Sequence, residues 1–289
     1  MTLTVRALDA PGIGLHEKLF RDTGAISLVD DPGPPPLPHH SAVAFLGGRA
    51  VGCIRIRPDA RDGHVIADLR GGVLPEARGQ GVGRALIEWF HQAGIAALGS
   101  RFVEALVDDG ACDEALKSIL MSNGFECEEF VELSAPTTPS RAAVLPGLSV
   151  RPMAGADISN AAAIHRLNGA MPRDLSEAER HLSAVWNSPY ASRAESIVVC
   201  EGRAMRGFAV VFRWPDDPND LWIECLAVDP GGGPSVHDVS RHLLATLRSA
   251  PAPTRTVSTG VARAQALQYE LAGFNADRTW RRFRQVFVA

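Results

Sequence analysis

Alternation of apolar and polar side chains predicts strands in the first half of the chain, and apolar residues spaced three to four apart predict helices. The clearest helix is residues 81–98, where Val82, Leu86 and Phe90 recur on one side. Two strands meet across Gly47-Gly48, a pair that favours a tight hairpin turn. We expect strands at residues 2–8, 41–46, 50–57, 64–74, 102–107 and 125–133, and helices at 14–23, 81–98 and 112–122.

The second half of the chain repeats this order of elements. Leu3-Thr-Val-Arg6 is answered by Leu148-Ser-Val-Arg151, and Gly124-Phe125 by Gly273-Phe274. The offset between matching residues drifts, which predicts a duplicated domain with loops of different length rather than a short-period repeat. We expect strands at residues 148–153, 196–201, 205–212, 220–228, 254–259 and 278–288, and helices at 158–167, 176–186, 236–249 and 262–272.

Two proline-containing segments interrupt the pattern. Residues 31–40 contain five prolines and cannot form a helix, so they are a loop inside the first half. Residues 135–147 have the composition of a linker and lie near the midpoint. We therefore expect an α/β protein (α+β, mixed sheet) with two tandem domains, residues 1–134 and 148–289, each a twisted mixed β-sheet flanked by helices.

Composition and charge narrow the function classes. The formal net charge of −4 disfavours a nucleic-acid partner. The five cysteines include no Cys-x-x-Cys pair, which predicts neither a disulfide framework nor a metal site. No apolar run is long enough for a membrane helix and the start does not resemble a secretory signal, so we expect a cytoplasmic protein with no membrane partner.

The two halves differ in charge. Residues 1–134 carry 12 basic and 19 acidic side chains, whereas residues 135–289 carry 17 and 14. An acidic first half can attract a small cationic partner, although we prefer ordinary solvated surface charge as the explanation of this difference.

The segment from Val73 to Leu86 carries the most informative chemistry. A strand ends, a glycine-rich loop with Arg78 and Arg84 follows, and a helix begins. Glycines let backbone N–H groups converge on an anion, and the helix start directs its positive dipole end to the same point. No Gly-Lys-Ser/Thr follows and the glycines are not spaced as GxGxxG, so the loop predicts a phosphate cradle of another kind.

Arg78-Gly-Gln-Gly-Val-Gly83 resembles the R/Q-x-x-G-x-G/A signature of the GNAT superfamily of acyl-CoA-dependent N-acyltransferases. The order of elements in each half is similar to that fold, so the chain resembles a tandem GNAT protein. The resemblance implies acetyl-CoA or another short acyl-CoA as co-substrate. It assigns pantetheine pairing to the strand end and diphosphate binding to the loop, together Gly71, Gly72, Val73, Arg78, Gly79, Gln80, Gly81, Val82, Gly83 and Arg84.

The Gly71-Gly72 pair also fits the β-bulge that separates this strand from its neighbour in the family. Many members place a carboxylate or histidine on this strand, at positions held here by Leu69 and Ala67. Many also use a tyrosine as the acid to the leaving thiolate, at a position held here by Leu120. The first half thus has the cofactor loop but not the usual proton-transfer groups.

The second half shows the opposite pattern. Glu224 and Tyr269 stand where the family places its carboxylate and its tyrosine. In the loop, however, Gly233 replaces the signature arginine, and Val236 and Asp238 replace the two signature glycines. We therefore expect a degenerate acyl-CoA loop in this half, with Glu224 and Tyr269 catalytic only if this is the active domain.

Three explanations stay open. The first half uses water or an off-pattern group such as Asp68, Asp108 or Asp109; the second half is active with an unusual loop; or the protein binds CoA without catalysis, as a pseudoenzyme, sensor or scaffold. We favour the first, an N-acyltransferase acting on a small-molecule amine. Arginines also cluster on the last strand, where they either bind an anionic ligand or, as we prefer, protect a sheet edge: Arg278, Arg281, Arg282 and Arg284.

Overall fold

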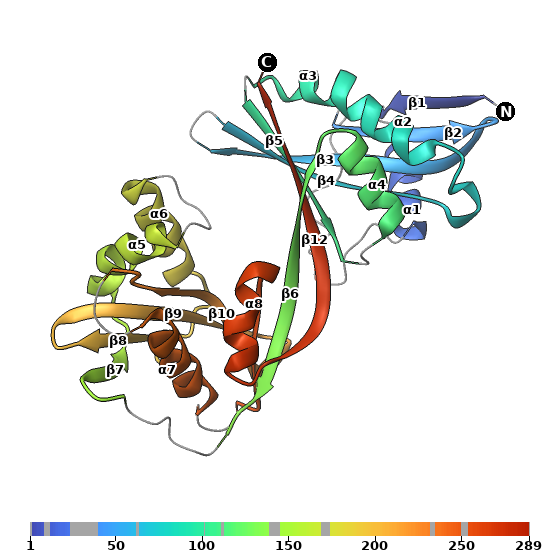
Figure 1. Cartoon of the computed structure of the whole chain (residues 1–289). Helices are drawn as coiled ribbons and strands as arrows, with labels where there is room; N and C mark the ends of the chain where they lie inside the picture. The colour runs from blue at the N-terminus through green and yellow to red at the C-terminus, as the bar shows by residue number, and fades with distance from the viewer. Residues whose placement is uncertain are drawn as a thin grey trace. The chain divides into compact units, whose positions relative to one another are not determined.

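The computed structural model describes residues 2–8, 12–23, 40–61, 64–100, 102–110, 113–138, 145–168, 174–231, 235–249 and 254–288. Residues 31–39 of the proline-rich loop, residues 139–144 of the expected linker, and Gly233 lie outside them. The chain divides into two compact units, shown in Figure 1. Unit 1 comprises Met1–Glu129 and Trp280–Ala289, and unit 2 comprises Phe130–Thr279.

Unit 1 is a mixed sheet with helices on both faces. Its strands follow the order β1-β2-β3-β4-β5-β12, and all neighbouring strands are antiparallel except β4 and β5, which are parallel. A π-helical turn, Phe90–Gly94, joins α2 to α3. The elements are β1 (Leu3–Ala7), α1 (Ile13–Asp22), β2 (Ser41–Leu46), β3 (Arg49–Arg61), β4 (His64–Val73), α2 (Val82–Trp89), α3 (Ile95–Leu98), β5 (Phe102–Asp109) and α4 (Glu114–Ser122).

The two faces of this sheet are covered differently. On the first face, α2 and α4 pack over a continuous core in which Phe90, Leu120 and Phe283 are fully buried. On the second face, α1 covers a smaller cluster that includes Leu19 and Phe20. Burying large aromatic and aliphatic side chains is the main stabilising contribution in both places.

Unit 2 has the same plan. Its strand order is β7-β8-β9-β10-β11-β6, with β10 and β11 parallel. Helices α7 and α8 pack on one face, over Leu221 and Leu243, while α5 and α6 pack on the other, over Phe208. The elements are β7 (Leu148–Pro152), α5 (Ile158–Leu167), α6 (Leu175–Trp186), β8 (Ile197–Glu201), β9 (Ala204–Trp214), β10 (Asp217–Val228), α7 (Val236–Arg248), β11 (Thr256–Ala262) and α8 (Arg263–Leu271). The expected mixed α/β fold is confirmed.

Strands β6 (Glu126–Pro136) and β12 (Asn275–Val288) each pass from one unit to the other. The last part of β12, Arg281–Val288, pairs with β5 in unit 1, and the last part of β6 pairs with β11 in unit 2. Each half of the sequence thus gives its final strand to the unit built mainly by the other half. The units therefore differ from the expected domains, residues 1–134 and 148–289, because residues 280–289 pack with the N-terminal half.

The expectation that the C-terminal arginines protect a sheet edge is wrong. β12 lies between β5 and β6 in the strand order, and three of the four arginines form ion pairs with neighbouring carboxylates. Arg281 contacts Glu114 at 2.5 Å and Glu129 at 3.5 Å. Arg282 pairs with Asp108 at 3.1 Å and Arg284 with Glu104 at 2.5 Å. These pairs fix β12 against β5 and α4.

Candidate functional site

The candidate site of unit 1 begins where β4 and β5 diverge. Parallel pairing joins residues 65–68 to residues 103–106 and, in the described part of the chain, stops there. β4 continues to pair with β3 as far as Val73, while the end of β5 pairs with β12. The stretch Leu69–Val73 therefore presents one backbone edge away from β3, and an extended ligand can add hydrogen bonds to such an edge.

The glycine-rich loop lies directly after this edge. Gly79 and Gly81 have φ values of 74° and 81°, in the left-handed region that glycine adopts without strain. Helix α2 begins at Val82, and no side chain caps its N-terminus. Because the first amides of a helix have no intrahelical acceptor, those of Val82, Gly83 and Arg84 are available to a bound anion.

Side chains near the loop hold its shape and leave its amides open. Arg78 Nε donates to the carbonyl of Val73 at 3.3 Å, and Gln80 Nε2 donates to the carbonyl of Glu76 at 3.0 Å. A Cβ at Gly83 would lie 3.3 Å from Ile119 Cδ1, so this glycine allows α2 and α4 to approach closely. Of the ten residues assigned to the cofactor by resemblance, seven lie from the strand end to the N-cap Gly81, and Val82, Gly83 and Arg84 form the first turn of α2.

The expected β-bulge at Gly71-Gly72 is wrong. The pairing of β3 with β4 runs without a register shift from Gly52 opposite Val73 to Arg61 opposite His64. The glycines serve close packing instead. A Cβ at Gly71 would overlap the carbonyl oxygen of Cys53, and a Cβ at Gly72 would lie 2.5 Å from Thr23 Oγ1 at the end of α1.

The bulge is found in unit 2, at Glu224. On β10, Ile223 pairs with Val211 and Cys225 pairs with Val210, so Glu224 has no partner on β9. Ile223 belongs to the core under α7 and α8, as Leu69 belongs to the core under α2 and α4. Leu69 and Glu224 are both four residues before a valine, Val73 and Val228, but they do not occupy equivalent positions. By register Leu69 corresponds to Ile223, and Glu224 is an inserted residue without a counterpart in unit 1.

Unit 2 does bring the predicted proton-transfer residues to its strand divergence. β10 and β11 pair as far as Ile223 and Thr259. Burial raises the pKa of the Tyr269 hydroxyl, although a hydrogen bond with Thr259 opposes that shift. Tyr269 is therefore a neutral phenol at physiological pH. Glu224 is exposed and accepts a hydrogen bond from Trp222 Nε1 at 3.1 Å.

Trp222 also covers the place where β10 and β11 separate. Two atoms of its indole lie 3.5 Å from the Cβ position of Gly260, the first residue of β11 beyond the paired stretch. In unit 1 the corresponding residue by face and register is Asp68. A large aromatic ring thus lies in unit 2 where unit 1 has a short carboxylate.

The helix start of unit 2 is occupied by its own side chains. Ser235 Oγ caps α7 by accepting from the amide of Asp238 at 3.1 Å, and its hydroxyl lies 2.7 Å from Asp238 Oδ2. The cap satisfies one amide that an anion would need, and the carboxylate places negative charge in the first turn. Gly231 N donates to Asp229, which adds a second carboxylate to this loop.

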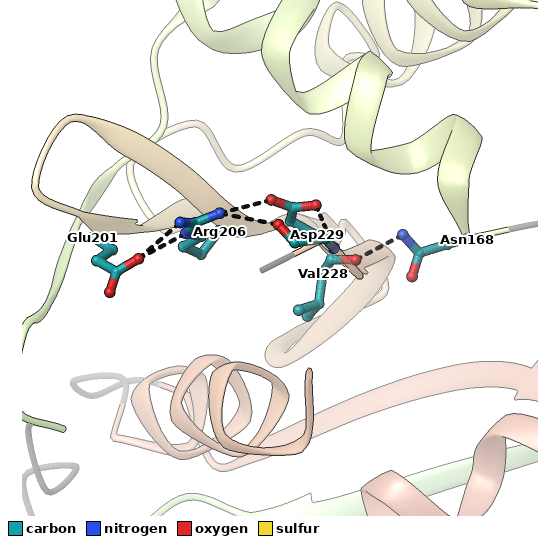
Figure 2. Close-up of polar contacts among 6 residues, drawn as sticks. Asn168, Glu201, Arg206, Val228 and Asp229 are labelled. Atoms are coloured by element: carbon teal, nitrogen blue, oxygen red, sulfur yellow. Dashed lines mark hydrogen bonds and ion pairs between the residues drawn. The ribbon is translucent and has the colours of Figure 1, made fainter. Parts of the chain in front are cut away.

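The strand end that precedes this loop is also engaged, as Figure 2 shows. Asn168 Nδ2 donates to the carbonyl of Val228 at 2.9 Å. Arg206 bridges Glu201, at 2.8 Å, and Asp229, at 3.0 Å. In unit 1 the matching carbonyl of Val73 also accepts a hydrogen bond, from Arg78 Nε, so the two units differ in the helix cap and in the acidic groups of the loop rather than at the strand end.

The three carboxylates considered as off-pattern bases in unit 1 already have partners. Asp68 lies 3.0 Å from Arg70 Nε and 3.9 Å from Arg57 Nε. Asp108 pairs with Arg282, and buried Asp109 accepts from the amide of Asp113 at 2.7 Å. Ala67, Leu69 and Leu120 are buried apolar residues that cannot transfer a proton. Among the described residues of unit 1, the candidate side chains for proton transfer are therefore either apolar or already engaged with a partner.

Two further observations concern the described residues alone. Among them, no three histidine, cysteine or acidic side chains gather as metal ligands would. None of the helices found there has the length and apolarity required to span a bilayer.

The sequence and the fold are both similar to those of known proteins. No curated protein matches the sequence significantly, but residues 38–127 match the family model described as an acetyltransferase (GNAT) domain. The chain is similar to a GCN5-related N-acetyltransferase from Sphaerobacter thermophilus, with 15% identity, a TM-score of 0.63, and coverage of 99% of this chain and 96% of that one.

It is also similar to a tandem GNAT protein from the clavulanic acid biosynthesis pathway, with 16% identity, a TM-score of 0.52, and coverage of 99% and 98%. At these identities the likeness shows the fold, which extends over both halves. Residues 38–127 thus match a GNAT acetyltransferase domain model, and the chain shares the fold of these two proteins over nearly its whole length.

Proposed function

We propose that the protein is an N-acyltransferase whose first unit holds acetyl-CoA, or another short acyl-CoA, and transfers the acyl group to the amine of a small molecule. The observation that carries this proposal is the combination of an open backbone edge at Leu69–Val73 and an uncapped helix start at Val82, joined by a loop with two left-handed glycines. An extended arm and a diphosphate fit this combination.

Each part of the cofactor has a distinct place in this arrangement. The amides from Gly79 to Arg84 bind the diphosphate, with the arginine side chains adding positive charge. The backbone of Gly71, Gly72 and Val73 pairs with the amide groups of the pantetheine arm. The thioester then lies in the divergence of β4 and β5, and the acceptor approaches from the face that α2 and α4 leave uncovered.

The chemistry is attack of an amine nitrogen on the thioester carbonyl. A C–N bond forms, the C–S bond breaks, the thiolate of CoA leaves, and the amine proton passes to solvent. Because the carboxylates described near the divergence of unit 1 are held in ion pairs or hydrogen bonds, we expect the acceptor amine to react in its neutral form. We expect the rate to rise with pH in parallel with deprotonation of the acceptor and to show no second ionisation from the protein.

A CoA-binding protein without transferase activity is the second candidate. The observation that favours it is the apolar character of Ala67, Leu69 and Leu120 in unit 1, where relatives with the full pattern have ionisable or hydroxyl groups. The two candidates share the cofactor site and differ only in whether free thiol is released.

Release of free CoA thiol from acetyl-CoA with a panel of amines distinguishes the candidates. The matched variants are Gly81→Asp and Gly81→Asn, since the Cβ position of Gly81 has open space and both residues tolerate left-handed backbone. Gly81→Asp places a carboxylate at the start of α2, as Asp238 does at the start of α7. We expect Gly81→Asp to abolish CoA binding and transfer, and Gly81→Asn to weaken both only modestly.

Transfer that survives Gly81→Asp unchanged would contradict the assignment of the cofactor to unit 1. Tight CoA binding without thiol release from any amine would instead support the second candidate.

A further inference from the structure

Helix α8 of unit 2 has two apolar faces. Its inner face packs into the core through buried Ala266 and Tyr269. Its outer face carries Leu267 and Leu271, which are 61% and 72% exposed. Residues four apart lie on the same side of a helix, one turn from each other, and exposed Ala264 extends this side toward the N-terminus. We call Ala264, Leu267 and Leu271 the outer stripe of α8.

The matching helix of unit 1 shows that the fold does not require this stripe. When the two halves are aligned on the Gly-Phe pairs that follow both helices, Leu267 corresponds to Ser118 of α4, and Leu271 corresponds to Ser122. A single exposed apolar side chain is ordinary on a protein surface. Two on successive turns, where the duplicated helix has serines, indicate a surface that a partner covers.

Charged residues flank the outer stripe on one side. Arg263 and Glu270 are seven residues apart, which places them two turns apart on the same side of α8. Arg263 Nη1 lies 3.4 Å from Glu270 Oε1, and the two side chains are 56% and 37% exposed. An exposed ion pair of this kind contributes little to stability, so each group can change partner at small cost. The uncharged Gln265 and Gln268 lie on the other side of the stripe.

This arrangement of charges is self-complementary in one orientation. If two copies of α8 pack antiparallel through their outer stripes, the charged side of one helix lies beside the charged side of the other. Arg263 of each copy then faces Glu270 of the other copy, as a two-fold axis through the contact requires. In a parallel pair, the charged side of one helix would lie beside the uncharged side of the other. The charges therefore favour a second copy of this chain, in antiparallel orientation.

We propose that the protein forms a symmetric dimer in which the outer stripes of two α8 helices pack antiparallel. Leu267 and Leu271 form the centre of the contact, and Arg263 of each copy pairs with Glu270 of the other. This inference goes beyond the proposed function and does not depend on it. Because α8 has nine residues and is about 13 Å long, the contact is small, and the dimer is a weak one that forms at high protein concentration.

Sedimentation velocity of the full-length protein, from about 1 µM to about 500 µM, tests the proposal. We expect the sedimentation coefficient to rise from that of a monomer toward that of a dimer. Leu267→Ser combined with Leu271→Ser reproduces the residues of α4. It should raise the dissociation constant about a hundredfold or more, because the burial of four leucine side chains is lost.

Met121→Ser is the matched control. It removes a 50% exposed apolar side chain from α4 of unit 1 and should leave the association unchanged. Thermal unfolding checks that each variant keeps its fold, as substitutions at exposed positions allow.

Exchanging the charges tests the orientation separately. Arg263→Glu gives this side of α8 two acidic groups, and Glu270→Arg gives it two basic groups. We expect each variant alone to dimerise about tenfold more weakly than the wild type. Mixed in equal amounts, the two variants should form a heterodimer at least as readily as the wild type dimerises, because both ion pairs between the copies are then attractive. A chain with both substitutions should dimerise like the wild type.

A wild-type protein that stays monomeric up to about 500 µM would overturn the inference, and so would a dimer that survives both leucine substitutions. Failure of the two charge variants to associate when mixed would also overturn it, because the antiparallel pairing of Arg263 with Glu270 requires that association.

Discussion

The two units share an element order but divide the expected machinery between them. Unit 1 has the glycine loop, an uncapped helix start and an open strand edge, and the carboxylates described near its divergence are held by other protein groups. Unit 2 has the bulged Glu224 and the buried Tyr269, and its helix start is capped by Ser235. The comparison shows that the cofactor-binding loop and the proton-transfer side chains can occur separately in this fold.

The differences are correlated within each unit. In unit 2 the carboxylate of Asp238 occupies the helix start, Asn168 binds the strand end, and Trp222 covers the divergence. In unit 1 the start of α2 is uncapped and the divergence carries Asp68, while the matching carbonyl of Val73 accepts from Arg78 Nε. The capped helix start and the indole of Trp222 in unit 2 thus both act against binding of a diphosphate and an extended arm.

The largest expected effect comes from deleting residues 280–289, which belong to unit 1 although they end the chain. The deletion removes fully buried Phe283 and the ion pairs of Arg281, so we expect unit 1 to unfold and CoA binding to disappear. Unit 2 keeps its own β6 pairing and should still melt cooperatively. A deletion variant that binds CoA like the full chain would show that the exchanged strand is dispensable.

Phe283→Ala is a smaller version of the same experiment. Removing a fully buried phenylalanine should lower the free energy of unfolding of unit 1 by about 3–5 kcal/mol, through lost burial and the cavity left behind. Val288→Ala, on the same strand but 74% exposed, is the control and should have little effect. Urea denaturation monitored by circular dichroism measures both, and equal effects would contradict the packing described for β12.

The first strands of the two sequence halves, β7 and β1, differ in a pH-dependent contribution to stability. Hydrogen bonds from Arg151 hold the pKa of Asp157 below its ordinary value, whereas the matching residue Arg6 lies over Phe45. A lowered folded-state pKa adds stability at neutral pH that is lost as the pH falls below about 3.9.

We therefore expect Asp157→Asn to lower the free energy of unfolding of unit 2 by about 1–2 kcal/mol at pH 7, allowing for the partial exposure of Arg151. The difference from the wild type should narrow as the pH is lowered through this range. Unfolding curves at several pH values measure it. A constant difference at all pH values would argue against the ion pair as the cause.

Ser235→Ala tests the side-chain cap that is present at the start of α7 and absent at the start of α2. Loss of the side-chain acceptor should cost unit 2 about 1 kcal/mol and should create no CoA binding, because Asp238 and the contacts of Val228 remain. Thermal unfolding and calorimetry provide the two measurements. Appearance of a second CoA site would mean that the cap alone excludes the cofactor.

The smallest expected effect on transfer is that of Tyr269→Phe. The buried phenol lies in the unit without an open cofactor loop, so the rate of thiol release should stay within about twofold of the wild-type rate. Its only expected consequence is a modest loss of stability from the missing hydroxyl contact. A tenfold or greater loss of kcat with an unchanged KM would place the chemistry in unit 2.

Much of the fold was predictable from the sequence. The hairpin at Gly47-Gly48, the long helix after Gly81 and the duplicated element order all follow from local patterns that the structure contains. Residues 236–248, for example, form α7 almost as apolar spacing predicts. The strand exchange was not predictable, because the pattern of residues 280–288 is the same whether β5 or β11 lies beside them.

The site was predictable in part. The anion-binding loop at Gly79 and Gly81 follows from glycine spacing, but the bulge does not, since one inserted residue leaves no trace in the alternation around Glu224. Gly71 and Gly72 allow close packing rather than forming a bulge, and the sequence alone does not distinguish the two because both require glycine.

The most direct test of the account is a calorimetric titration of the full-length protein with CoA, together with the Gly81→Asp variant. We predict one CoA bound per chain and complete loss of binding in the variant. Two CoA molecules per chain, or an affinity that Gly81→Asp leaves unchanged, would contradict the claim that the cofactor is held by the open helix start of unit 1.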